Sequence, residues 1–195
     1  MSELMVPPGA KKCFDKASKL LHKNKVDDAL KELNKALGMW PRYAAALSLR
    51  GFLEMTRNQH QKALNDFSAA VANDPGYAPA YVGLAADYNR TGKFDMALKV
   101  LDRSKPFTSG SWQLHFEASK ALLGMKSFTS ALKEANEASK IYGQELPDFR
   151  LVRAQAYLQL KQTEAAIREL RECLAKESKG PRAEKIRQFL SALRK

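Results

Sequence analysis

The chain has 195 residues, of which 33 are Lys or Arg and 21 are Asp or Glu, giving a formal net charge of +12. Hydrophobic residues make up 45% of the sequence, which excludes a wholly disordered chain. Its apolar runs are only a few residues long, far below the ~20 residues that a membrane-spanning helix needs, so we expect no membrane span.

Residues 1–9 are predicted to form a flexible N-terminal segment. They lack the basic flank and apolar run of a secretory signal, which favours a cytoplasmic protein. A periplasmic or secreted protein stays open if a signal or a larger chain was removed. Cys13 and Cys173 lie near opposite ends of the chain, which excludes a disulfide scaffold, and we expect both to be small buried side chains.

From residue 10 onward the sequence repeats itself every 34 or 35 residues. We predict five repeats, over residues 10–43, 44–77, 78–111, 112–146 and 147–180. The same alanine recurs in the second half of each repeat, at Ala29, Ala63, Ala97, Ala131 and Ala166. An alanine lets two helices approach closely, and one helix pair cannot bury its apolar stripe alone. The pattern therefore predicts helix pairs that stack on one another.

Each repeat is predicted to contain two helices, most clearly the third repeat. Residues 78–90 place Tyr81, Leu84 and Tyr88 on one helical face, and residues 95–103 form the second helix. We therefore expect an antiparallel helix pair with a short turn in each repeat.

The predicted turn between the two helices has its own signal. Asn24, Asn58 and Gly92 occupy equivalent positions, and Asn and Gly tolerate the left-handed conformation that ends a helix. Lys126 and Lys161 hold that position in the fourth and fifth repeats. There we expect the turn to close differently.

In the second and third repeats, large and small residues recur at fixed spacings. The second repeat contributes Leu47, Gly51, Ala63, Phe67, Ala70 and Pro75, and the third contributes Tyr81, Leu84, Ala85, Tyr88, Ala97 and Leu101. These spacings resemble the tetratricopeptide repeat, whose pattern is W-x2-L-G-x2-Y, then A-x3-F, then P. The resemblance covers residues 10 to about 178. It implies an all-α fold, a right-handed superhelical solenoid of antiparallel helix pairs.

The sequence departs from the family pattern in two places that bear on structure. Arg50 and Glu54 stand at positions that are normally apolar, so the first helix of the second repeat is expected to be rotated or partly exposed. Residues 181–195 are predicted to form a C-terminal capping helix, apolar inside and charged outside. Its apolar residues at helical spacing are Ile186, Phe189, Leu190 and Leu193.

The resemblance implies a non-catalytic scaffold that binds a peptide or protein segment in a concave groove lined by the first helix of each repeat. The predicted groove residues are Lys11, Phe14, His22, Ser48, Phe52, Met55, Val82, Asn89, Arg90, Phe116, Lys120 and Gln155. The aromatic members either form apolar pockets for a partner or pack beneath the next repeat, and the sequence leaves both open. Some family members clamp a C-terminal carboxylate with two Lys, two Asn and one Arg. The corresponding residues here, Phe14, Ser18, Leu49, Pro79 and Gly83, cannot form that clamp.

Two alternative functions remain open. A helical repeat protein can bind nucleic acid, but the positive charge is concentrated at the ends of this chain. Residues 1–43 carry nine basic and five acidic groups, residues 181–195 carry five and one, and the second and fourth repeats are neutral. We do not expect a nucleic-acid partner, and the basic ends suit an acidic protein partner. The chain could also self-associate as a structural subunit, through Trp40 or Trp112, although packing between repeats is the commoner fate of both.

The sequence gives no support for catalysis. His22, His60 and His115 lie in different repeats, without a carboxylate or nucleophile at a recognisable spacing. Asp27 and Asp28 stand at a helix start, where carboxylates favour the helix dipole without a metal. We therefore expect neither a cofactor nor a metal site, and no enzyme activity.

Overall fold

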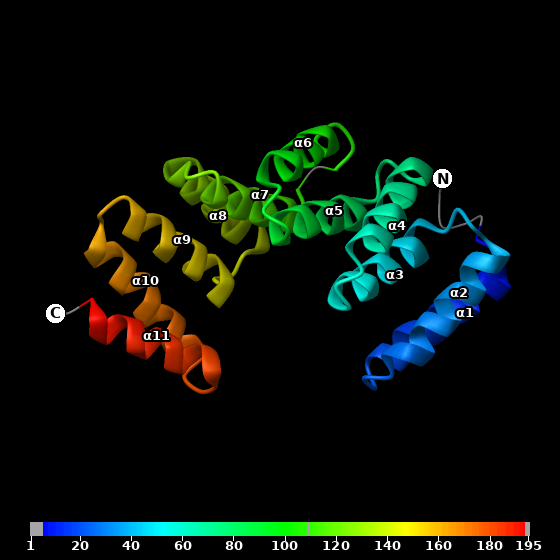
Figure 1. The fold of residues 1–195 in the computed structure, drawn as a ribbon, viewed down its shortest axis with the longest axis horizontal. Helices are drawn as coiled ribbons and strands as arrows, with labels where there is room; N and C mark the ends of the chain where they lie inside the picture. Colours follow the sequence, from blue (N-terminus) through cyan, green and yellow to red (C-terminus); the bar gives the residue numbers. More distant parts are fainter. Residues whose placement is uncertain (1–5, 109, 194–195) are drawn as a thin grey trace. The chain divides into compact units, whose positions relative to one another are not determined.

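A computed structural model describes residues 6–108 and 110–193 (Figure 1). Every regular element in these residues is an α-helix, which confirms the all-α prediction. The helices are α1 (Pro8–Leu21), α2 (Val26–Met39), α3 (Ala44–Thr56), α4 (His60–Asn73), α5 (Ala78–Arg90), α6 (Phe94–Ser104), α7 (Trp112–Gly124), α8 (Phe128–Tyr142), α9 (Pro147–Gln159), α10 (Thr163–Lys176) and α11 (Pro181–Ala192). Among the residues described, no helix is both long enough and apolar enough to span a membrane.

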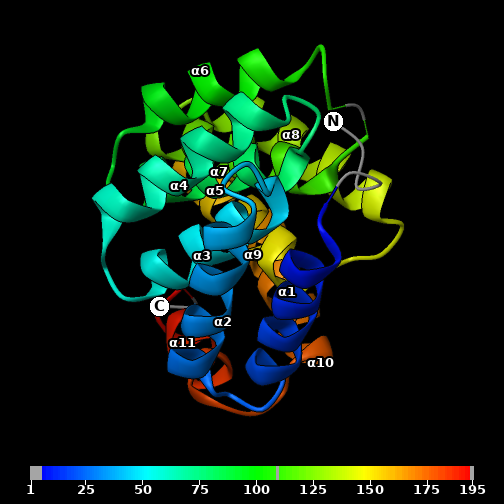
Figure 2. The same cartoon turned by 90° about the vertical axis from the view of Figure 1, so that its right-hand side faces the viewer.

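The helices belong to two units. One contains residues 6–91 and 99–108, and the other contains residues 92–98 and 110–193, so α6 has residues in both. In the first unit α1 contacts α2, α3 contacts α4, and α2 and α4 each also contact the next helix of the chain. In the second unit α7, α8, α9, α10 and α11 contact one another in sequence. Each unit is therefore a solenoid of helix pairs, and α1 and α2 lie side by side in both views (Figure 1 and Figure 2).

The first helices of four predicted repeats start where the sequence analysis placed them. Helices α3, α5, α7 and α9 begin at Ala44, Ala78, Trp112 and Pro147. Helix α1 begins earlier than expected, at Pro8, because a proline is well tolerated in the first turn of a helix. Residues 1–5 of the predicted flexible segment lie outside the described residues.

The recurring alanines occupy the contacts between helices. Ala29, Ala63, Ala97, Ala131 and Ala166 are all fully buried, as the sequence predicts.

Two glycines allow an equally close approach of helices around the ring of Phe67. A Cβ added at Gly51 would lie 2.9 Å from Phe67 Cε1, and one added at Gly83 would lie 2.2 Å from the same atom. Helices α3 and α5 both approach the fully buried Phe67 ring on α4 closely because these two positions lack a side chain.

The turns within the repeats all use the same backbone conformation. Asn24, Asn58 and Gly92 have φ values of 55°, 59° and 74°, and Lys126 and Lys161 have 62° and 59°. The prediction that the lysine-containing turns close differently is wrong. The length of the turn fixes the left-handed conformation, and the two lysines adopt it although a Cβ makes it unfavourable.

A basic residue in the first helix pairs with an acidic residue 16 positions later in three of the predicted repeats. Lys16 Nζ lies 3.0 Å from Glu32 Oε1, Arg50 Nε lies 2.7 Å from Asp66 Oδ2, and Arg153 Nε lies 2.9 Å from Glu169 Oε1. Each ion pair joins the two helices of its own repeat, and Arg50 stands at a position that the family pattern normally fills with an apolar residue. A hydrogen-bonded pair can replace an apolar contact when both charges are satisfied.

This pairing explains the unusual Arg50. Its Nη1 also donates to Asn34 Oδ1 at 2.8 Å, so the half-buried guanidinium has partners on α2 and α4. Leu47 and Gly51 of the same helix are buried, as the repeat pattern expects. Helix α3 is therefore not rotated, and Arg50 reaches its partners from the ordinary helix orientation.

Helix α11 covers the apolar surface of α9 and α10. Ile186 and Leu190 are buried against Ala154, Ile167 and Cys173, and Leu193 is partly buried against the same cluster. Phe189 does not join them, because its side chain is 44% exposed on another face of the helix. The prediction that Phe189 belongs to the inner face of the cap is wrong. Cys173 is buried, as expected, whereas Cys13 is only partly buried.

Candidate functional site

The predicted groove residues of α1 have different environments. Lys11 is exposed and lies 3.8 Å from Asp15 in an ion pair one turn away. Phe14 is half-buried, with its ring centroid 5.1 Å from that of Tyr43 at the start of α3. His22 is exposed and follows the last residue of α1. Of these three residues, only Lys11 and His22 have freely accessible side chains.

Helix α3 contributes less accessible surface than the sequence predicts. Ser48 is only 1% exposed because α3 packs against both α4 and α5, so it does not belong to an open groove. Phe52 is half-buried and packs edge-on against Phe67, with ring centroids 4.9 Å apart. Met55 is half-buried, and its carbonyl accepts a hydrogen bond of 2.6 Å from Arg90 Nη2.

On α5, Val82 and Asn89 are half-buried and Arg90 is exposed. The guanidinium of Arg90 also donates to Asn58 Oδ1 at 2.8 Å, in addition to the Met55 carbonyl. Arg90 therefore fastens the end of α5 to the turn between α3 and α4. This structural role was not predicted from the sequence.

On α7, Phe116 and Lys120 form a packed group. The Phe116 ring lies edge-on to Phe149 of α9, with centroids 5.3 Å apart, and Lys120 Nζ lies 5.3 Å from the Phe116 centroid. Lys120 also pairs with Glu117 at 2.8 Å. Trp112 packs against Tyr142 and Phe149, at centroid distances of 4.9 and 5.6 Å. For Phe14, Phe52, Phe116 and Trp112, packing against a neighbouring helix is the environment observed.

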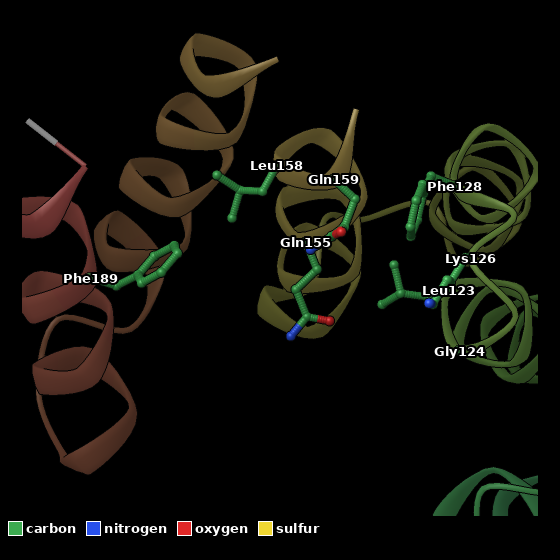
Figure 3. A pocket seen from close by; sticks show the side chains of 8 residues that line it. All are labelled: Leu123, Gly124, Lys126, Phe128, Gln155, Leu158, Gln159 and Phe189. Carbon is green, nitrogen blue, oxygen red and sulfur yellow. The ribbon is translucent and has the colours of Figure 1, made fainter. Parts of the chain in front are cut away.

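A cavity of about 480 Å³ lies at the ends of α7 and α9 in the second unit (Figure 3). It is lined by Leu123, Gly124, Lys126, Phe128, Gln155, Leu158, Gln159 and Phe189. We call it the α9 pocket. Its volume lies within the range of ~300–1,000 Å³ that is common for ligand sites. Gln155 is the one predicted groove residue that lines it.

The α9 pocket combines apolar surface with hydrogen-bonding groups. Gln155 and Gln159 are exposed, and their amides offer both donors and acceptors. Figure 3 shows Leu158 and Phe189 directed toward one another on one side of α9, and Leu123 and Phe128 on the other side. This arrangement is typical of a site that holds an apolar group and fixes its orientation with a few polar contacts.

Lys126 is the one charged residue among the eight that line the pocket. It is exposed, and it pairs with no carboxylate in the part of the chain that the structure describes. Its position follows from the turn between α7 and α8, where the left-handed backbone places it between Leu123 and Phe128. The formal charge of the residues that line the pocket is therefore positive.

The sequence analysis missed most of the pocket. Leu158 occupies the same place in its repeat as Leu123 does one repeat earlier, a periodicity that could have identified it. Phe189 carries no such signal, because the spacing of apolar residues on α11 assigns it to the inner face. Only the packing of Ile186 and Leu190 leaves Phe189 available to the pocket.

Two histidines have carboxylate partners that their spacing did not indicate. His60 Nδ1 lies 2.8 Å from Oδ1 of the fully buried Asp87, and His115 Nδ1 lies 2.7 Å from Glu134 Oε2. The expectation that no histidine has such a partner is wrong, because α4 meets α5 and α7 meets α8 at these points. Residues 6–108 and 110–193 contain no group of three His, Cys, Asp or Glu side chains that could hold a metal ion.

The folded arrangement is that of a helical repeat protein, with a pocket lined by residues of α7, α8, α9 and α11. Residues 14–78 match the family model of the tetratricopeptide repeat. These residues are tetratricopeptide repeats, and the chain as a whole has the tetratricopeptide repeat fold. No curated protein matches the chain.

Solved structures of the same fold extend over nearly the whole chain. The thermophilic repeat protein TTC0263 from Thermus thermophilus is 19% identical over 94% of this chain and 98% of its own, with a TM-score of 0.74. The Cut9–Hcn1 hetero-tetramer of the APC/C gives a TM-score of 0.83 at 17% identity, over 94% of this chain and 36% of the other. YrrB, a tetratricopeptide repeat protein with an unusual peptide-binding site, gives 0.64 at 16% identity, over 90% of both chains. Proteins with this fold commonly serve as protein–protein interaction scaffolds.

Proposed function

We propose that this chain is a non-catalytic scaffold that binds a peptide or protein segment, with the α9 pocket as its principal contact. The supporting observation is the pocket itself, where apolar side chains of α7, α8, α9 and α11 surround two exposed glutamines. The division of residues 10–180 into five repeats, followed by a cap from residue 181, is part of the same proposal.

The character of the pocket favours a peptide over a small polar metabolite. A peptide brings an apolar side chain, which can enter between Leu158 and Phe189, together with backbone amides, which can bond to Gln155 and Gln159. The peptide-binding site of YrrB indicates that the fold can support such recognition in a protein of similar architecture.

The experiment is selection of a random twelve-residue peptide library displayed on phage against the immobilised full chain. The affinities of the selected peptides for the wild type and two variants are then measured by calorimetry. Phe189→Ala removes an apolar wall of the pocket and should weaken binding about tenfold. Phe107→Ala is the matched control, because Phe107 is a similarly exposed phenylalanine that does not line the pocket. Equal affinities of the two variants would contradict the proposed site.

A further inference from the structure

The one charged side chain among the eight that line the α9 pocket is positive. Lys126 lines the pocket and lacks a carboxylate partner among the described residues. On α11, Lys185 precedes Phe189 by four residues, so the two share a helix face. Lys185 is likewise exposed and takes no part in the ion pairs found within residues 110–193. None of the eight lining residues is acidic.

Several other cations of the second unit are neutralised by carboxylates of the chain. Lys120 pairs with Glu117 at 2.8 Å, Arg153 pairs with Glu145 at 2.6 Å, and Arg182 lies 3.3 Å from Asp148. A positive charge that is satisfied within the protein offers little to a partner. A cation without an internal partner, placed at the rim of an apolar pocket, attracts a carboxylate from outside.

We infer that the α9 pocket selects acidic peptide segments in which an apolar side chain stands next to an aspartate or glutamate. The apolar side chain lies between Leu158 and Phe189, and a carboxylate of the segment faces Lys126 on the other side of Gln155 and Gln159. A second acidic residue of the segment, on the side of α11, faces Lys185. This inference rests on the proposed function and specifies the chemistry of its partner.

The arrangement favours an acidic peptide over a nucleic acid. Nucleic-acid binding depends on several Lys or Arg side chains that follow a phosphate backbone. Here one lysine stands among apolar and amide side chains, which suits a single carboxylate beside an apolar anchor. The charge-complementary partner is therefore a protein segment.

The left-handed backbone at Lys126 allows a substitution that removes the charge and suits the turn. Lys126→Asn removes the charge while placing a residue that tolerates the left-handed conformation at φ 62°. Lys161→Asn is the matched control. Lys161 is exposed, has nearly the same φ of 59° and occupies the same place in the next repeat, but it does not line the pocket. Loss of folding therefore cannot account for a difference between the two variants.

The test uses the peptides selected from the phage library and their counterparts in which every Asp and Glu is replaced by Asn and Gln. We expect the selected sequences to be enriched in acidic residues beside Leu or Phe, and the neutral counterparts to bind more weakly. Lys126→Asn should weaken binding of the acidic peptides about threefold, within the range of an exposed ion pair. It should leave the neutral peptides unchanged, and Lys161→Asn should change neither. The wild-type affinity for the acidic peptides should also fall as salt is added.

The possible outcomes separate this inference from the proposed function. Peptides that depend on Phe189 but show no acidic preference, and no effect of Lys126→Asn, would overturn the inference and leave the pocket as a peptide site. An equal loss of affinity in Lys126→Asn and Lys161→Asn would also overturn it. Failure to select any peptide that depends on Phe189 would overturn both.

Discussion

Arg50 and Asp66 form a two-point ion pair between α3 and α4, with Nε to Oδ2 and Nη2 to Oδ1 distances of 2.7 Å each. The hydrogen bond to Asp66 raises the pKa of Arg50, against the opposing effect of burial. The pair joins the two helices of one repeat, at positions where the third repeat has Leu84 and Val100. The ion pair thus occupies positions that hold two apolar residues in the neighbouring repeat.

Removing one partner of this pair should destabilise the fold, whereas replacing both should not. Asp66→Val leaves Arg50 without its main partner and should lower the free energy of unfolding by about 2 kcal/mol. The double variant Arg50→Leu with Asp66→Val reproduces the Leu84 and Val100 combination and should lie close to the wild type. Urea denaturation followed by circular dichroism measures all three proteins. A double variant no more stable than Asp66→Val alone would show that the two positions do not act as a pair.

The ion pairs of Glu32 should make stability depend on pH in the acidic range. The hydrogen bonds from Lys35 and then from Lys16 lower the pKa of Glu32 from 4.5 to about 2. Because the folded state holds the ionised form, this contribution is present above about pH 4.5 and is lost as the pH falls through 2. Glu32→Gln should therefore have a lower midpoint of thermal unfolding than the wild type at pH 7, and the difference should shrink between pH 4.5 and 2. A difference that is constant with pH would argue against this origin.

The two lysines in left-handed turns should be suboptimal for stability. Lys126→Asn and Lys161→Asn should each raise the free energy of unfolding by about 0.5 kcal/mol, because Asn adopts this conformation at less cost. The two turns lie in different repeats, so the gains should add. Gly92→Ala, at the equivalent turn with φ 74°, should have the opposite effect. Chemical denaturation of these variants and the wild type checks the set, and a loss of stability in both lysine variants would refute the explanation.

Neighbouring residues of α11 should respond differently to truncation. Leu190→Ala removes a buried side chain from the cluster with Ile167 and Ile186 and should cost about 3 kcal/mol. Phe189→Ala removes an exposed side chain and should change stability by less than about 0.5 kcal/mol. Thermal unfolding of the two variants measures the contrast. Comparable destabilisation would mean that Phe189 contributes to the cap rather than to a free surface.

Truncation of Phe116 should affect folding as well as any partner. Its ring packs against Phe149, which is fully buried, and lies beneath Lys120, so Phe116→Ala should destabilise the chain by about 2 kcal/mol. Phe52→Ala should behave alike because its ring packs against Phe67. Gln155→Ala offers the comparison, since Gln155 is exposed and should leave stability unchanged. Stability of Phe116→Ala equal to that of Gln155→Ala, by denaturant titration, would contradict this packing role.

The sequence by itself determined where most of the helices start and which small residues lie between them, because this signal is local and recurs. The buried alanines at Ala29, Ala63 and Ala131 and the helix starts at Ala44 and Ala78 follow from a spacing that five copies reinforce. Small residues must stand wherever two helices approach closely, so their period reveals the helix pairs without knowledge of the contacts.

The tertiary structure alone decided which side chains are available to a partner. Phe52 and Phe116 have the spacing of groove residues but are packed, whereas Phe189 has the spacing of a core residue but is exposed. A helical period identifies a face of a helix, but burial of that face depends on the neighbouring helix and on the angle at which it packs. The α9 pocket is made by residues from α7, α8, α9 and α11 together, and their convergence is a property of packing that no single repeat encodes.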